Sequence, residues 1–231
     1  MNILALDTSM GVCGAAVLLA GGDTRRTVLC EESMARGHAE ALMPLVAEAM
    51  EGAGIGFAEL DLIAATLGPG SFTGVRIAIA AARGFALVTS AKLWGTDTLS
   101  VMARVALRSG AVEAGKPFAV AVDARGEMLY AGLYDGQGRK LDGPLLIDAD
   151  EMSALLPHDL AVAVGSGAVH LAEAAHRHGL RVEEMRPDLQ PSAAALAELA
   201  SEANETLLAL RPLYLRPPDA KPQASMAVAR R

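Results

Sequence analysis

Aromatic and basic residues are scarce in this chain of 231 residues. It contains four Phe, three Tyr and one Trp, and 20 Lys and Arg stand against 27 Asp and Glu, which gives a formal net charge of -7. Domains that grip RNA directly need a broad basic surface and aromatic rings on which bases stack. The composition therefore argues against a dedicated RNA-binding domain, and we expect any RNA to be held mostly by another molecule.

Cysteine and histidine are also too sparse to suggest a disulfide framework or a metal site. The two cysteines, Cys13 and Cys30, lack the spacing of zinc ligands, so we expect buried, reduced thiols. No pair of histidines has HxxxH or HExxH spacing, and no metal ligand is predicted. The five histidines are His38, His158, His170, His176 and His178.

Long apolar runs are absent, although the mean hydropathy is +0.31. No stretch of about 18 uncharged apolar residues occurs, which argues against a membrane-spanning helix. Asp7 interrupts the first apolar run and no basic segment precedes it, so no signal peptide is predicted. These features favour a soluble cytoplasmic protein with no membrane partner, whose apolar residues fill an interior or an interface.

The N-terminal half has the pattern of a sheet flanked by helices. A helix is predicted across 38–50, where Pro44 should kink the first turn or delay the start of the helix. Further helices are predicted from about Thr73 and after Gly95, with Thr96 or Asp97 as the N-cap of the second. The strands are expected within 2–20, where two strands meet at a turn over Ser9 to Gly11, at 25–30, and at 60–67 as a buried parallel strand.

A motif of strand, acidic turn and strand occurs twice. ILALDTSMGVCGAAVLL near the N-terminus matches FAVAVDARGEMLYAGLY in mid-chain, where Asp123 to Gly126 forms the turn. A strand at 160–164 then leads into a glycine turn, Gly165 to Gly167, and a helix across 168–178. We therefore predict two lobes of related design. The expected boundaries are 1–112 for the first lobe, 113–210 for the second, and 211–231 for a strap and a flexible basic tail.

The stretch GPGSFTG at 68–74 has the glycine content of a phosphate-binding loop without its chemistry. A Walker loop needs Lys and then Ser or Thr after its last glycine, whereas Gly74 is followed by Val75 and Arg76. The helix that follows is apolar nearly all round, so nearly all of it must be covered. We expect one side to lie on the chain's own sheet and the other to dock a partner helix. Burial of both sides within one fold is the alternative, and an anion at the helix N-terminus stays open.

This predicted docking helix belongs to the first lobe. Phe72, Ile79 or Phe85 is the expected anchor, and Arg76 and Arg83 are the expected charge contacts at the rim. Bulk beside the small residues, as in Gly74→Arg, is expected to break association and leave the fold intact. The predicted interface residues are Gly70, Phe72, Thr73, Gly74, Arg76, Ile77, Ala80, Ala81, Arg83 and Gly84.

Two hairpins with acidic turns, and a glycine turn before a late helix, are the layout of the actin-like ATPase fold. In that fold the hairpin turns hold phosphate and metal, and Asp7 and Asp123 stand at the corresponding places. These turns hold fewer glycines than a loop that wraps a triphosphate, so the simpler alternative is an Asp that caps its own turn. The candidate residues of a vestigial nucleotide site are Asp7, Thr8, Ser9, Asp123, Gly165 and Gly167.

GPGSFTGVRIAIAAARGFA, together with ILALDTS, GHAEALMPLV and VDARGEMLYAGLY, resembles the bacterial TsaB (YeaZ) family over most of residues 1–135. The resemblance implies an α/β, actin-like ATPase (ASKHA) fold with two lobes of mixed sheets flanked by helices. It implies a non-catalytic accessory role in forming N6-threonylcarbamoyladenosine (t6A) in tRNA. The partners that it implies are the catalytic paralogue TsaD, the small ATPase TsaE, a second copy when the paralogue is absent, and tRNA through the complex.

The segment from Gly95 to Met102 lacks the pair of metal-binding histidines that the catalytic paralogue carries there. The resemblance therefore implies no catalytic residue and no metal in this chain. No cofactor is expected on the chain alone, while ATP or ADP with magnesium stays open for the complex. An older peptidase label finds no support in the sequence, because Ser71 and Ser100 have no identifiable base.

Two other functions stay open on the sequence alone. The first is a free-standing actin-like ATPase or small-molecule kinase that uses Asp7 and Asp123. The second is a homodimeric interaction protein unrelated to tRNA. The segment from Arg211 to Arg231 holds five Lys and Arg against one Asp. We expect its tail to be loose or packed on the protein, with contact to tRNA phosphates as the alternative.

Overall fold

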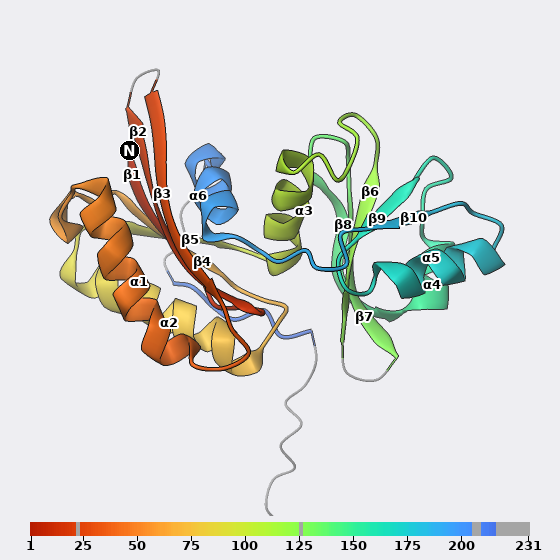
Figure 1. The fold of residues 1–231 in the computed structure, drawn as a ribbon, viewed down its shortest axis with the longest axis horizontal. Helices are drawn as coiled ribbons and strands as arrows, with labels where there is room; N and C mark the ends of the chain where they lie inside the picture. The colour runs from red at the N-terminus through yellow and green to blue at the C-terminus, as the bar shows by residue number, and fades with distance from the viewer. Residues whose placement is uncertain (22–23, 125–126, 205–208, 216–231) are drawn as a thin grey trace, which may run out of the picture.

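Two five-stranded sheets form the framework of the molecule (Figure 1). The computed structural model describes residues 1–21, 24–124, 127–204 and 209–215. The strand order is β3-β2-β1-β4-β5 in the first sheet and β10-β9-β6-β7-β8 in the second. Both sheets mix antiparallel and parallel pairs and are flanked by helices, so the predicted α/β class with mixed sheets is confirmed.

The chain completes the first sheet before it begins the second. The elements of the first half are β1 (Asn2–Asp7), β2 (Val12–Gly21), β3 (Thr24–Ser33), α1 (His38–Ala53), the 3-10 helix η1 (Phe57–Glu59), β4 (Leu62–Thr66), α2 (Phe72–Val88), β5 (Lys92–Thr96) and α3 (Thr98–Arg108). Those of the second half are β6 (Phe118–Asp123), β7 (Met128–Tyr134), β8 (Lys140–Asp148), α4 (Ala149–Ala154), β9 (Val162–Val164), α5 (Ala168–Arg177), β10 (Glu183–Met185) and α6 (Ala193–Glu202).

The two halves repeat one topology. Read from its other edge, the second sheet runs β8-β7-β6-β9-β10, which matches the first sheet strand for strand. In each half an antiparallel hairpin is followed by a parallel strand beside its first strand, as in β1 with β4 and β6 with β9. The predicted repeat of strand, acidic turn and strand is therefore confirmed, and α2 and α5 occupy equivalent places after β4 and β9.

Strand alternation distributes the apolar residues over two layers of core on either side of the first sheet. Leu4 and Leu6 pack with α1 and α2 on one face, and Ile3 and Ala5 pack with α6 on the other. The second sheet does the same with α4 and α5 on one face and α3 on the other. Helices α3 and α6 therefore lie between the two sheets (Figure 1).

Ion pairs join these two central helices. Arg104 on α3 donates to both carboxylate oxygens of Glu202 on α6 at 2.7 and 2.6 Å, and Arg108 pairs with Glu198 at 2.7 Å. Helix α6 lies within the predicted 113–210 lobe, yet it packs on β1 and β2 of the first sheet. The boundaries at 112 and 210 stay a prediction.

Most elements predicted from periodicity are present, and several others are added. The two N-terminal strands, the strands near 25–30 and 60–67, the mid-chain hairpin and the helix from 168 are confirmed. Helix α1 begins at His38 with Pro44 inside it, so the predicted later start is wrong. The strands β5, β8 and β10 and the helices α4 and α6 were not predicted from the sequence. Within the described ranges, every helix falls short of the length and apolar content that a bilayer crossing needs.

Candidate functional site: the turns and the helix α2

The glycine-rich loop before α2 lies against the backbone of the β1–β2 turn. Ser71 donates its N–H to the carbonyl of Ser9 at 2.7 Å, and its hydroxyl accepts the N–H of Gly74 at 3.2 Å as the N-cap of α2. A Cβ at Gly70 would stand 2.3 Å from the Ser9 carbonyl oxygen, and one at Gly74 would stand 1.9 Å from that of Thr8. The glycines therefore serve a close approach of two backbones.

Thr8 ties that turn into the helix itself. Its buried hydroxyl donates to the carbonyl of Gly74 at 2.6 Å and accepts the N–H of Ala78 at 3.2 Å. These two backbone groups lie four residues apart and pair with each other in a regular α-helix. A side chain inserted between them fixes the helix to the turn and is a known cause of local bending.

Asp7 ends β1 and caps its own turn. Its carboxylate accepts the N–H of Ser9 at 3.1 Å and the Ser9 hydroxyl at 3.1 to 3.2 Å. The side chain is buried, and this burial raises the pKa of Asp7, against the opposing effect of the hydrogen bonds that it accepts. Thr8 and Ser9 are fully buried as well. The simpler alternative of a turn-capping Asp therefore accounts for these contacts, and a vestigial nucleotide site stays a prediction.

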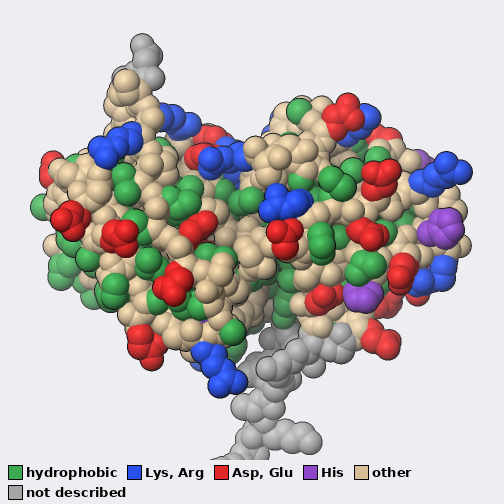
Figure 2. Space-filling view, viewed as in Figure 1, with side chains coloured by type: hydrophobic (Ala, Val, Ile, Leu, Met, Phe, Trp, Pro, Cys, Tyr) green, Lys and Arg blue, Asp and Glu red, His purple; other side chains and the backbone are tan. Residues whose placement is uncertain are grey.

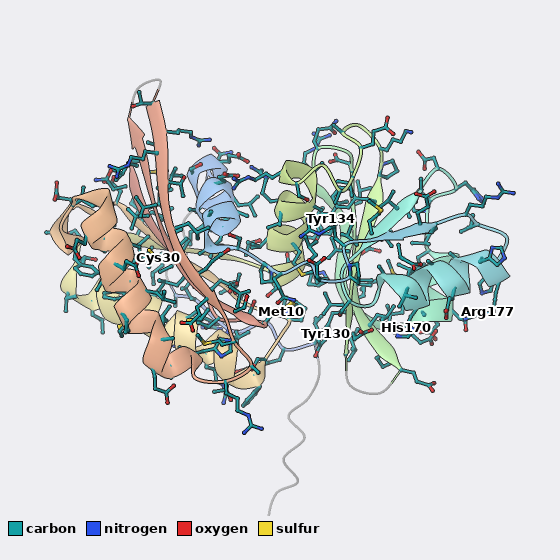
Figure 3. All side chains as sticks on the ribbon, in the orientation of Figure 1. Met10, Cys30, Tyr130, Tyr134, His170 and Arg177 are labelled. Carbon is teal, nitrogen blue, oxygen red and sulfur yellow. The ribbon has the colours of Figure 1, made fainter. Side chains whose placement is uncertain are left out.

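The same turn reaches the second lobe. Met10 packs against the cluster formed by α3, β6 and β7, and Figure 3 places it near Tyr130, between the two sheets. The N–H of Gly11 donates to the side-chain oxygen of Gln190 at 3.0 Å. One short turn thus contacts α2 on one side and the second lobe on the other.

The equivalent turn of the second half is more open. The side chain of Asp123 is 47% exposed and lies 3.7 Å from His170 on α5. Its N–H donates to the hydroxyl of Ser166 at 3.0 Å, and the N–H of Gly167 donates to the carbonyl of Ala121 at 3.1 Å. A Cβ at Gly165 would stand 2.4 Å from the same carbonyl. The predicted turn residues 125 and 126 lie outside the described residues.

The outer face of α2 exposes several apolar side chains beside two arginines. Phe72 is 46% exposed, Leu87 87% and Val88 81%, and Met43 on α1 adds to the same side of the first sheet. Figure 2 shows hydrophobic side chains gathered at the outer edge of the first lobe, where α1 and α2 lie. We call Phe72, Thr73, Arg76, Ala80, Arg83, Gly84, Leu87 and Val88 the outer face of α2.

The structure sorts the predicted interface residues into three groups. Phe72, Thr73, Arg76, Ala80, Arg83 and Gly84 are exposed, and Gly70, Ile77 and Ala81 are half-buried. Gly74 is buried against the Thr8 carbonyl, so its predicted place on the docking surface is wrong, as is the expectation that Gly74→Arg leaves the fold intact. Ile79 is also wrong as a docking anchor, because it is 3% exposed and packs in the core beneath the helix. Phe85 is half-buried and stacks on Phe57 at 5.0 Å.

A strap of residues 210–215 crosses α2, and sequence reasoning did not place it there. Arg83 donates to the carbonyl of Leu210, and the N–H of Leu213 donates to the carbonyl of Leu67 at 2.6 Å. Arg76 donates its Nε–H to the hydroxyl of Tyr214 at 2.7 Å. The strap predicted from Arg211 is present over 211–215, and the tail at 216–231 lies outside the described residues.

The two serines considered for nucleophilic chemistry act as helix caps or partners of caps. Ser71 caps α2, and Ser100 donates its hydroxyl to Asp97, the N-cap of α3, at 2.7 Å. Asp97 also accepts the ammonium of Lys140 from β8 at 2.9 Å. In the described part of the chain, no three His, Cys, Asp or Glu side chains are arranged to hold a metal ion.

Comparisons with known proteins agree with this architecture. The family model described as TsaD, tRNA N6-adenosine threonylcarbamoyltransferase, matches residues 31–210. A protein of Escherichia coli K12 named tRNA threonylcarbamoyladenosine biosynthesis protein TsaB is 36% identical over 133 residues, 57% of this chain and 54% of that protein. A tRNA N6-adenosine threonylcarbamoyltransferase of Sorangium cellulosum is 32% identical over 172 residues, 67% of this chain and 47% of that protein. The matches thus span about half the length of these curated relatives.

Solved structures match over nearly the whole chain. A Pseudomonas aeruginosa protein described as similar to peptidase YeaZ superposes with a TM-score of 0.80 at 30% identity, covering 93% of this chain and 99% of that one. A ROK hexokinase of Thermus thermophilus superposes with a TM-score of 0.50 at 16% identity, which shows the fold alone and confirms the predicted actin-like architecture. The chain therefore belongs to the TsaB (YeaZ) family.

Proposed function

We propose that this chain is a non-catalytic subunit in the formation of t6A in tRNA, and that it binds and activates a TsaD-type catalytic paralogue. The observation that carries the proposal is the outer face of α2, where Phe72 is exposed at one end and Leu87 and Val88 at the other, with the small exposed residues Ala80 and Gly84 between them. Exposed apolar patches of this kind mark interaction sites on soluble proteins. Small residues at Ala80 and Gly84 allow the backbone of a partner helix to approach closely.

The absence of catalytic chemistry in this chain is part of the proposal. Ser71 and Ser100 are engaged at helix N-termini, and Asp7 caps its own turn in a buried position. The segment from Gly95 to Met102 holds an N-cap carboxylate, Asp97, where the resemblance expects metal-binding histidines in the paralogue. The reaction is therefore assigned to the partner.

The kinship of chain and partner supports a helix-to-helix contact. Residues 31–210 match the family model of the transferase, so a TsaD-type partner is expected to carry a helix equivalent to α2. Two equivalent helices related by a pseudo-two-fold axis bury their faces against each other, as subunits in symmetric dimers do. We further propose that a second copy of this chain occupies the face when the paralogue is absent. TsaE and tRNA join through the complex, in the cytoplasm.

Reconstituted modification of tRNA tests this function. An unmodified tRNA is incubated with the threonylcarbamoyl-adenylate synthase, TsaD and TsaE, and this chain is added or omitted. We expect t6A, measured by nucleoside mass spectrometry, to form only when the chain is added. Equal product without the chain would remove the accessory role, and product with the chain but without TsaD would make the chain itself catalytic.

A further inference from the structure

Arg76 stands at the centre of an ordered aromatic cluster on the outer face of α2. Its guanidinium carbon lies 3.6 Å from the centroid of the Phe72 ring and 5.6 Å from that of Tyr214. The two rings are 5.3 Å apart and inclined by 31°. Phe72 and Tyr214 are each 46% exposed, so the cluster lies at the surface.

These contacts fix the guanidinium and leave part of it unengaged. Tyr214 accepts only the Nε–H, and a guanidinium has four more N–H groups on its two Nη atoms. Within the described residues, Arg76 forms no ion pair, and α2 contains no Asp or Glu. The ring contacts and the Tyr214 hydroxyl reduce the conformational freedom that the side chain would lose on binding.

Arg83, one heptad further along the same face, is engaged differently. Its guanidinium donates to the carbonyl of Leu210, a fully buried residue at the start of the strap. Arg83 therefore holds the strap that carries Tyr214 across the helix. The two arginines predicted as rim contacts therefore differ in their contacts. Arg83 uses an Nη group on the strap, whereas the hydrogen bond found for Arg76 within the described residues uses its Nε–H.

We propose that Arg76 is a carboxylate receptor, which binds one Asp or Glu side chain of the TsaD-type partner through its two Nη groups. Tyr214 is the positioning residue that holds the guanidinium for this contact. The inference rests on the proposed function and names the charge that the partner must bring to the outer face of α2. Two parallel N–H···O bonds between arginine and a carboxylate are among the strongest and most directional pairs at interfaces.

The surroundings favour a protein carboxylate over an RNA phosphate. Arg76 is flanked by Phe72, Ile77 and Ala80, and the one other basic residue of α2 is Arg83, which is bound to the strap. Phosphate binding relies on several Lys and Arg that neutralise a charged backbone together. Aromatic residues with a central arginine are the composition of protein interface cores.

The experiment measures the dissociation constant of the chain and its TsaD-type partner by calorimetry, without RNA. Arg76→Gln is expected to raise this constant about 30-fold, the weakening typical of an interface hot spot. Tyr214→Phe keeps the ring and removes the hydroxyl, and should raise it about 3- to 10-fold. In the Arg76→Gln background, Tyr214→Phe should have no further effect, because a positioning residue acts through the guanidinium. Arg177→Gln on α5 is the matched control, expected to leave the constant unchanged.

The following outcomes test the proposed function and the role of Arg76 separately. If the unaltered chain does not bind the partner, the proposed function fails. If Ala80→Arg abolishes binding but Arg76→Gln binds like the unaltered chain, the surface is right and the receptor is wrong. An Arg76→Gln chain that binds the partner normally but weakens homodimers, or weakens tRNA binding by the assembled complex, would assign Arg76 to a second copy or to phosphate and overturn the inference. Arg76→Lys keeps the positive charge but not the paired N–H groups of the guanidinium. It should bind more tightly than Arg76→Gln and less tightly than the unaltered chain.

Discussion

Helices α2 and α5 follow equivalent strands in the two halves, yet their exposed faces differ in chemical character. The exposed residues of α5 are polar or charged: His170, Glu173, His176 and Arg177. The outer face of α2 has Phe72, Leu87 and Val88 exposed, and no acidic residue. A helix whose exposed face is polar is compatible with solvent, whereas an exposed apolar face is typical of a surface that binds a partner. The same topology therefore carries a polar surface in one half and, in the other, the exposed apolar surface that we propose as a docking site.

The hairpin turns that contact these two helices differ in burial as well. The first turn is buried, with Thr8 inserted into α2 and Asp7 closed off from solvent. The second turn leaves Asp123 half-exposed beside His170, and it borders a hollow of about 740 Å³ that α4 and α5 also line. Tight coupling of turn and helix thus accompanies the helix that is proposed to dock.

The largest expected difference in stability between the halves comes from replacing the glycines where each turn meets its helix. Gly74→Ala places a Cβ 1.9 Å from the Thr8 carbonyl oxygen, where backbone must move. We expect it to lower the free energy of unfolding by more than about 3 kcal/mol. Gly167→Ala meets the end of the buried Leu129 side chain at 2.7 Å and the backbone of Val122 and Asp123 at 3.2 Å. This is a looser fit than at Gly74, so the change should cost about 1–2 kcal/mol. Urea denaturation measures both, and equal losses would contradict the stronger coupling in the first half.

The hydroxyl of Thr8 gives the next largest effect. Thr8→Val keeps the shape of the side chain and removes both hydrogen bonds to α2, so it should lower the free energy of unfolding by about 1–3 kcal/mol. Ser166→Ala, which removes one bond from the less buried second turn, should cost less than Thr8→Val. Thr8→Ser restores the hydroxyl and is expected to recover most of the stability. If Thr8→Val and Thr8→Ser lowered the free energy of unfolding by the same amount, the hydroxyl contacts would not explain the stability.

The effect of replacing Asp7 should depend on pH. Because burial raises the pKa of Asp7, the folded state binds a proton more readily than the unfolded state. Its contribution to stability is therefore fully present below the unfolded pKa of about 4 and is lost as the pH rises through the folded value. Asp7→Asn removes this dependence, so its stability relative to the unaltered chain should increase with pH. A flat difference between the two across that range would contradict the sign.

The smallest change separates stability from docking. Gly84 lies on the outer face of α2, and a Cβ built there meets no atom within 4 Å. Gly84→Ala should raise the free energy of unfolding by about 0.5–1 kcal/mol, because alanine favours the helix. The same methyl group lies where a partner helix is proposed to approach, so affinity for the partner should fall while stability rises. A rise in both would place the contact elsewhere on the helix.

The sequence predicted the repeated layout and the helix α2 better than it predicted contacts between distant segments. Strong apolar strands and the repeated acidic turn gave β1, β2, β6 and β7, and periodicity gave α2 within one residue of its start. The short strands β9 and β10 have three residues each, and only β9 carries an apolar run. The acidic β10 pairs through its backbone, which composition does not reveal.

The residues that were wrongly placed from the sequence are those that suit either an interface or the interior of the fold. Gly74 and Ile79 fit an interface by composition, but Thr8 and the sheet cover them. Nothing local to Tyr214 indicates that it returns to α2 across 138 positions of sequence.

The most direct test of the account is the affinity of the TsaD-type partner for Ala80→Arg. Ala80 is exposed at the middle of the outer face of α2, so an arginine there should leave the fold intact and obstruct close helix packing. Ala154→Arg, at an exposed position on α4 of the second half, is the matched control. We predict that Ala80→Arg weakens binding by more than about 100-fold, as loss of an interface centre does, while Ala154→Arg has no effect. Binding of Ala80→Arg as tight as that of the unaltered chain would contradict the docking role of α2.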